Sequence, residues 1–195
     1  DQYEVTMDDY QKCVRAERCS VLEKTVKYEG YSEEDVRKWS PFCNVNQRGG
    51  GRHPVNCVDW TQAEAYCKWA GKRLPTEEEW EYAARGTDGR KYPWGNEAPS
   101  SQLCWKRWES KAGTCEVGSY SGGNSPFGLK DMAGNVWEWT ESGYSEDYSK
   151  NRATDRRVSR GGGWSSSDPS FVRASNRDWS NPSLRDGYLG FRCAR

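Results

Sequence analysis

Two carboxylates lie seven residues apart in one short segment, where they could bind a metal ion. Asp131 and Glu138 flank a Gly-Asn turn that could present their side-chain oxygens together with the backbone carbonyls between them. Hard oxygen ligands of this kind are the ones that Ca²⁺ prefers. The segment therefore predicts a structural calcium site that fastens an irregular backbone. The alternative is that both carboxylates bond neighbouring amides or indoles.

The chain has eight cysteines and one histidine, and their spacing indicates crosslinks rather than metal binding. The cysteines form no paired CxxC knuckles, so the all-cysteine set that a zinc site would need here is missing. Disulfides are the better interpretation, and they imply an oxidising compartment, extracellular or periplasmic. The alternative is eight buried free thiols in a cytosolic protein.

A third set of polar and aromatic side chains lies between residues 164 and 181 and has the composition of a recognition surface. Tryptophan offers rigid contact area at low entropy cost, and serine and asparagine offer adaptable hydrogen bonds. This mixture suits a peptide, and it also suits a glycan. The alternative is that serine and asparagine only mark exposed turns. The side chains predicted to bind the ligand are Trp164, Ser166, Asp168, Arg173, Arg177 and Trp179.

Composition limits both the core and the class of partner. The chain has 12 Val, 6 Leu, 4 Phe and no Ile, so its 11 Trp and 11 Tyr must supply much of the core. Its 29 Lys and Arg balance 29 Asp and Glu, which argues against nucleic acid or an anionic membrane held by bulk attraction. No run of about 18 apolar residues predicts membrane insertion. The first residues lack the pattern of a signal peptide, and we expect any such peptide to have been removed.

The elements that must position these residues begin with three helices. The first starts after Thr6, the second follows a strand-like run at 54–60, and the third starts after Thr76 and ends at Gly86. In the third helix the Thr76 hydroxyl can cap the amide of Glu79 while the Glu79 carboxylate reaches back to the amide of Thr76. This is the clearest local signal in the sequence.

The rest of the chain predicts little regular structure. Residues 17–52 are rich in charges, Gly and Pro, and we expect an irregular excursion there that disulfides hold down. Turn clusters separate short strand-like pieces in the C-terminal half. The length favours one domain over residues 1–195, an irregular α+β domain. The expected strands are 116–120, 136–140, 158–164 and 189–194.

Several blocks of sequence together are far more specific than these local signals. In their order and spacing they closely resemble the formylglycine-generating enzyme (sulfatase-modifying factor) family, and the resemblance extends to the opening DQYEVT at 1–6. The family's first strand begins some residues earlier, which indicates a processed or truncated form. The matching blocks are VNCVDW at 55–60, AYCKWAGKRLPTE at 65–77, EWEYA at 79–83, YPWG at 92–95, DMAGNVWEW at 131–139, RGGGW at 160–164 and GFRC at 190–193.

The resemblance implies a fold and permits a test of the chemistries found on it. The implied fold is an irregular C-type-lectin-like formylglycine-generating-enzyme fold with little regular secondary structure. The family's copper-binding cysteines would fall at about Ser166 and Phe171, and no cysteine lies between Cys115 and Cys193. A hydroxyl and a phenyl ring cannot replace the thiolates that Cu(I) needs. The three-histidine iron site of related sulfoxide synthases cannot form either, because His53 is the one histidine in the chain. We therefore expect neither copper nor iron.

The resemblance also assigns the metal ligands and one disulfide. It implies calcium ligation by the side chains of Asp131 and Glu138 and by the carbonyls of Gly134 and Val136. It pairs Cys67 with Cys193, after which Cys104 and Cys115 are natural partners across a turn-rich loop. The four remaining cysteines allow three pairings, of which we favour Cys13 with Cys19 and Cys43 with Cys57.

The expected function is therefore binding rather than catalysis. We expect a secreted or periplasmic, calcium-stabilised domain whose partner is a glycan, a peptide or an envelope protein. One alternative is an enzyme of the same family with a non-standard site that uses Ser166, although no histidine is near to activate it. The other is a structural subunit of a surface assembly, which leaves self-association open. Four tryptophans lie outside the family blocks, and the search for functional residues therefore narrows to these four and the loop after Trp164. They are Trp39, Trp105, Trp108 and Trp179.

Overall fold

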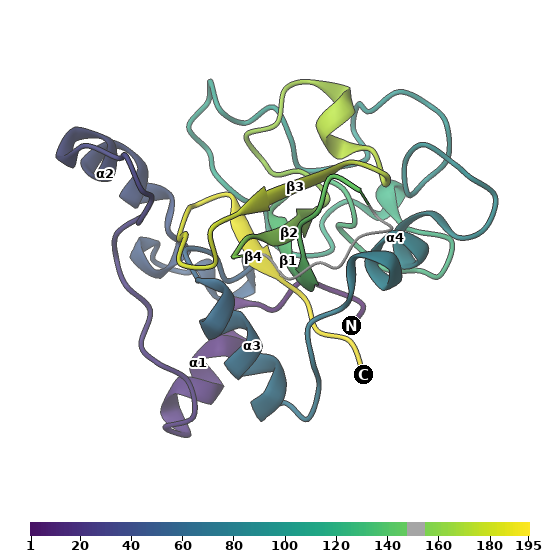
Figure 1. The fold of residues 1–195 in the computed structure, drawn as a ribbon. Coiled ribbons are helices and arrows are strands. Elements are labelled where there is room, and N and C mark those ends of the chain that lie inside the picture. Colours follow the sequence, from purple (N-terminus) through teal and green to yellow (C-terminus); the bar gives the residue numbers. More distant parts are fainter. Residues whose placement is uncertain (148–154) are drawn as a thin grey trace.

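A short mixed sheet lies at the centre of the molecule (Figure 1). The computed structural model describes residues 1–147 and 155–195. The strand order is β3-β2-β1-β4, with β1 and β4 parallel and the other neighbours antiparallel. The strands are β1 (Trp137–Gly143), β2 (Arg157–Arg160), β3 (Arg177–Ser180) and β4 (Leu189–Phe191).

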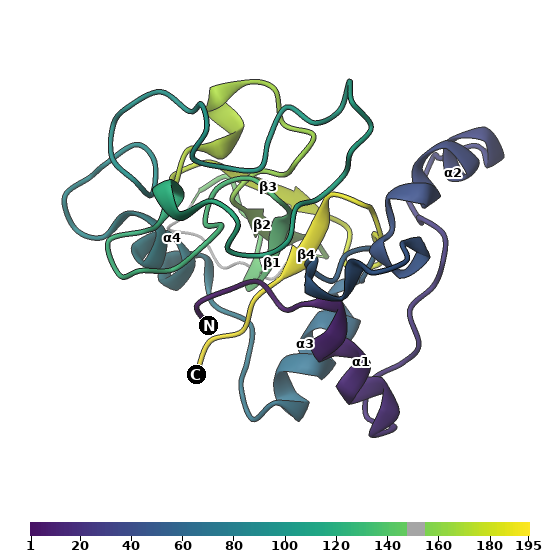
Figure 2. The same ribbon diagram turned by 180° about the vertical axis from the view of Figure 1, so that it is seen from behind.

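Helices and long loops surround this sheet. Helices α1 and α3 contact each other below the sheet in Figure 1, whereas α2 lies apart at the edge of the molecule in both Figure 1 and Figure 2. Short 3₁₀ turns occur at 40–42, 44–46, 50–52, 121–123 and 169–172. The α-helices are α1 (Met7–Arg15), α2 (Glu33–Trp39), α3 (Trp60–Trp69) and α4 (Glu77–Arg85).

The helix signals in the sequence are confirmed, with one addition. Thr6 caps α1, and the Thr76 hydroxyl accepts the amide of Glu79 while Glu79 bonds back to the amide of Thr76. The prediction of little regular structure over 17–52 overlooked α2. That helix begins with a capping box of its own, because Ser32 and Asp35 exchange the same pair of bonds.

The strand predictions need three corrections. The strand-like run at 54–60 forms only an isolated bridge, between Pro54 and Thr6. No strand forms at 116–120, where the chain makes turns instead. The structure adds β3, which lies within the segment expected to be a binding loop. Its residues are exposed or half-buried, so they lack the apolar alternation that marks a strand, and pairing with β2 holds them in place.

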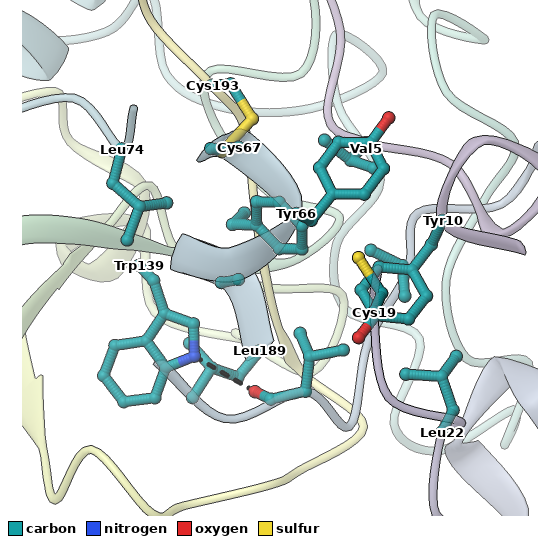
Figure 3. Packing of buried hydrophobic residues seen from close by; sticks show 14 of the residues in the cluster. Val5, Tyr10, Cys19, Leu22, Tyr66, Cys67, Leu74, Trp139, Leu189 and Cys193 are labelled. Atoms are coloured by element: carbon teal, nitrogen blue, oxygen red, sulfur yellow. Dashed lines mark hydrogen bonds between the residues drawn. A yellow bond between two sulfur atoms is a disulfide. The ribbon is translucent and has the colours of Figure 1, made fainter. Parts of the chain in front are cut away.

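The core is largely aromatic, as the composition required. Trp80, Trp139 and Trp164 are almost completely buried. Figure 3 shows Tyr10, Tyr66 and Trp139 packed with aliphatic side chains, and the Trp139 indole donates to the Val58 carbonyl at 3.1 Å. Each such ring removes roughly 150–250 Å² from water, which offsets the shortage of aliphatic residues.

All eight cysteines form disulfides, and the pairs are those expected. The Cys67–Cys193 disulfide joins α3 to the end of the chain across 126 residues. The others are Cys13–Cys19, Cys43–Cys57 and Cys104–Cys115. Four disulfides are typical of proteins that fold in an oxidising, non-cytosolic compartment. Across the described residues, no helix combines the length and apolar character needed to cross a membrane.

Candidate functional site

A buried ion pair lies where β1, β4 and α4 meet. Both Arg192 and Glu138 are almost fully shielded from solvent, and Arg192 donates to both carboxylate oxygens of Glu138 at 2.6 and 2.7 Å. The Trp80 indole donates a third bond at 2.7 Å. Glu138, which the sequence predicted to be a calcium ligand, therefore has both oxygens engaged as the counter-ion of Arg192.

Two more carboxylates lie in the electrostatic field of this pair. Glu4 is buried, and its oxygens accept from the Asn135 amide group at 2.6 Å and from the Val136 amide at 3.3 Å. Burial, followed by repulsion from Asp131 and Glu138, raises the pKa of Glu4 well above its ordinary value. Burial likewise raises the pKa of Asp131, whose carboxylate accepts the Gly118 amide at 2.5 Å.

Arg192 is the positive charge that these carboxylates share. Burial alone would lower the pKa of Arg192, but Glu138, reinforced by Glu4 and Asp131, raises it. Its guanidinium also donates to the Lys130 carbonyl at 2.8 Å. Glu138, Glu4 and Asp131 therefore all act electrostatically on this one guanidinium.

The turn at 131–135 holds these groups together through an unusual backbone. Asp131, Gly134 and Asn135 all have positive φ, and a Cβ on Gly134 would lie 2.5 Å from the Cys104 carbonyl oxygen, so only glycine fits. The Asn135 side chain also accepts the Cys115 amide at 2.9 Å. The turn is thereby tied to the Cys104–Cys115 disulfide loop.

The turn offers oxygen ligands of the kind that calcium takes. In the described hydrogen bonds, the carbonyls of Gly134 and Val136 are not used as acceptors, and the Glu4 carboxylate touches the same turn. Within 1–147 and 155–195, no group of three or more His, Cys, Asp or Glu side chains is arranged as a metal site. A cation here would therefore need backbone carbonyls as well as carboxylates. The sequence did not predict that Glu4 belongs to this site, although Glu4 lies in the family-like opening DQYEVT at 1–6.

The six residues predicted to bind a ligand are spread over several places. Trp164 is buried, and its indole donates to the Gly187 carbonyl at 2.9 Å. Ser166 is also buried, and its hydroxyl accepts the Gly163 amide at 3.1 Å. Asp168 caps a 3₁₀ turn through the Ser170 amide at 2.7 Å. The first three therefore have structural partners.

The other three predicted residues lie nearer the surface. Arg173 is exposed at the end of that 3₁₀ turn. Arg177 forms a two-bond pair with buried Glu77 at 2.7 and 2.9 Å. Trp179 is 37% exposed, and the Arg156 guanidinium lies 3.6 Å from the centre of its ring.

Two pockets in the surface are each lined by one of the predicted tryptophans. Trp179 lines a groove of about 850 Å³ along β3, with charged, hydroxyl and aromatic neighbours. Trp164 lines a smaller aromatic cavity of about 180 Å³, together with Trp39 and Trp108. Arg177 borders a third hollow beside α4. The predicted binding loop therefore serves more than one surface.

No cysteine thiol is free, and the imidazole of His53 is bonded at one of its two ring nitrogens. The cysteine sulfurs are all in disulfides. The Nδ1 atom of His53, the one histidine, lies 2.8 Å from the Thr114 hydroxyl, and burial lowers the pKa of the imidazole. Of the two residues expected at the positions of the family's copper cysteines, Ser166 is buried and Phe171 is exposed.

The short curled sheet, long loops and four disulfides place the protein among irregular, crosslinked α+β domains. Within that class the chain belongs to the family described as the sulfatase-modifying factor enzyme 1-like domain, whose model matches residues 1–195.

Relatives of known function include both an inactive and an active protein. The chain is 43% identical over 156 residues to the inactive C-alpha-formylglycine-generating enzyme 2 of Bos taurus, covering 72% of this chain and 50% of the relative. It is 39% identical over 170 residues to the formylglycine-generating enzyme of Streptomyces coelicolor, covering 75% and 54%. The chain thus spans about half the length of these relatives.

A solved structure supports the fold independently. PvdO from Pseudomonas aeruginosa superposes with a TM-score of 0.73 over 97% of this chain and 77% of that chain, at 24% identity. An identity this low bears on the fold alone.

Removing one member of the buried ion pair should destabilise the protein strongly. We expect Glu138→Gln to lower the free energy of unfolding by about 3–5 kcal/mol, because it leaves the Arg192 guanidinium buried without its counter-ion. Urea unfolding followed by tryptophan fluorescence measures the change. Glu64→Gln is the control, since Glu64 pairs with exposed Lys68 and should cost less than about 1 kcal/mol. Equal losses in the two variants would contradict this assignment.

Proposed function

We propose that this chain is a non-catalytic ligand-binding domain on a formylglycine-generating-enzyme scaffold. The observation that carries the proposal is the state of its cysteines, all eight of which are in disulfides. Oxidation of a substrate cysteine by the family's copper chemistry needs thiolates on the enzyme to hold Cu(I). Ser166 and Phe171, which match the positions of those thiolates, supply none.

The groove beside β3 is the proposed binding surface. Its lining combines the aromatic rings of Tyr28 and Trp179 with the polar groups of Ser180, Asn181 and Ser183. Flat rings next to hydroxyl and amide groups suit a glycan, and the same mixture suits an extended peptide. Lys27, Glu29 and Asp178 also line the groove, so it offers charges of both signs to either ligand.

Other roles on the same scaffold have weaker support. An enzyme that uses Ser166 would need a base, and the buried hydroxyl accepts a backbone amide while the one imidazole belongs to His53. A structural subunit of a surface assembly would use exposed rings such as Tyr82 and Phe127, whose ring centres lie 5.0 Å apart. The same rings could contact an envelope protein as the partner. The disulfides favour an extracellular or periplasmic site of action in each case.

Calcium is the cofactor that we propose for the turn at 131–135. Asp131, with the carbonyls of Gly134 and Val136, supplies hard oxygen ligands, and the neighbouring Glu4 side chain contacts the same turn through the Val136 amide. Glu138 contributes through the field of the centre, since its oxygens bond Arg192. The ion would be structural, because it would neutralise buried carboxylates and fasten the turn.

Screening the purified protein on glycan and peptide arrays tests the binding function. We expect saturable binding that Trp179→Ala weakens about tenfold or more, because a central aromatic anchor contributes roughly 2 kcal/mol or more to such interfaces. Trp69→Ala is the matched control, since Trp69 is also exposed, at 39%, but lies outside the groove. Absence of any bound glycan or peptide, or equal losses in the two variants, would overturn the assignment of this groove.

Adding Ca²⁺ to chelator-treated protein tests the cofactor. We expect the melting temperature to rise by about 5–10 °C at saturating Ca²⁺, because binding to the folded state alone is worth about 3 kcal/mol at a hundredfold excess over Kd. Asp131→Asn should abolish the rise, whereas Asp88→Asn should keep it, since Asp88 only pairs with Arg90 on the surface. A wild-type protein that shows neither the shift nor heat in titration calorimetry would rule out the site.

A further inference from the structure

A cluster of aromatic rings lines a half-open pocket that shares Tyr188 with the groove along β3. The rings pack on one another, since the Trp39 and Trp108 ring centres lie 4.5 Å apart, Phe42 and Trp164 lie 4.8 Å apart, and Trp108 and Trp164 lie 5.9 Å apart. Tyr31 and Tyr188 complete the wall, and the volume of the pocket is about 180 Å³. At roughly 30 Å³ per water molecule this is room for a small group of a few heavy atoms.

The walls come from distant parts of the chain and are held rigidly. Trp39 ends α2 and Phe42 precedes the Cys43–Cys57 disulfide, while Trp108 lies inside the loop closed by Cys104–Cys115. The indole of Trp164 is fixed by its bond to the Gly187 carbonyl. A cavity with fixed walls loses little conformational entropy when a ligand enters.

One carboxylate supplies the only formal charge in the lining. Asp186 is 5% exposed, and the Tyr31 hydroxyl donates to it at 2.9 Å. In the described part of the chain, no Lys, Arg or His side chain forms an ion pair with it. A buried carboxylate without an ion-pair partner is costly, so a positive group entering the pocket would be stabilised.

The geometry points to a site for a quaternary ammonium group, bordered by Trp39, Trp108 and Trp164 and balanced by Asp186. The faces of aromatic rings attract a cation through their quadrupole, and pockets lined by aromatic rings are the usual receptors for methylated ammonium. The chain already shows this affinity at its surface, where the Lys38 ammonium lies 4.4 Å from the Trp39 ring centre.

The chemistry of the walls favours a methylated cation over other small ligands. The lining is mostly aromatic carbon, so the three N–H groups of a primary ammonium would find few acceptors beyond the Asp186 carboxylate, which also accepts the Tyr31 hydroxyl. Burying unpaired donors is unfavourable, whereas trimethylammonium has none. An anion would meet the Asp186 carboxylate without any compensating positive charge in the lining.

Isothermal titration with choline tests the site, with dimethylbutanol, its neutral carbon isostere, as the paired probe. We expect choline to bind saturably and the neutral isostere to bind at least about tenfold more weakly, because it lacks the charge that the rings and Asp186 attract. Phosphocholine in a parallel titration separates the two sources of this group. Tighter binding than choline assigns a lipid headgroup, and weaker binding assigns a free solute.

Variants locate the binding to this cavity and separate it from the groove. Asp186→Asn and Trp108→Ala should each weaken choline binding about tenfold, and Trp108 is 39% exposed, so its loss should leave the fold intact. Trp69→Ala and Trp179→Ala should stay within about twofold of wild type. Equal binding of choline and its neutral isostere, no saturable binding of choline, or an unchanged Kd in Trp108→Ala would overturn the site. Failure of the β3 groove to bind glycan or peptide would leave this result unaffected.

Discussion

The ion pair between Glu138 and Arg192 is the constraint on which the rest of the structure depends. It joins β1 to the segment after β4, and the Trp80 indole brings α4 to the same carboxylate. A buried charge costs several kcal/mol unless it is paired and bonded, so these elements have to keep their relative positions. The turn at 131–135 and the Glu4 carboxylate then pack around this ion pair.

Local signals in the sequence were enough to predict several elements but not the whole sheet. The caps at Thr6 and Thr76 act within one turn, so they could be read directly, and they begin α1 and α4 as expected. Strand β3 was missed because it is exposed and takes its conformation from pairing with β2. Helix α2 was missed because a Gly- and charge-rich surrounding hid the capping box at Ser32.

The site was predictable where one motif contained it and unpredictable where several segments meet. The resemblance to the family supplied the Cys67–Cys193 pair, which the structure confirms. It assigns Glu138 to the metal ligands, which stays a prediction, and it gave no sign that Glu138 bonds Arg192, 54 residues away. The aromatic pocket around Asp186 combines four separate regions of the chain, so spacing along the chain could not reveal it. Counting tryptophans outside the family blocks did point to Trp39 and Trp108.

A scaffold shared by active and inactive relatives supports either chemistry or recognition. We propose recognition for this chain because all of its cysteine sulfurs are in disulfides. The most direct measurement is aerobic incubation of the protein and Cu(I) with a cysteine peptide carrying the sulfatase motif, followed by mass spectrometry. The Streptomyces coelicolor enzyme serves as the positive control. Our account predicts an unmodified peptide, and formylglycine formed over many turnovers would contradict it.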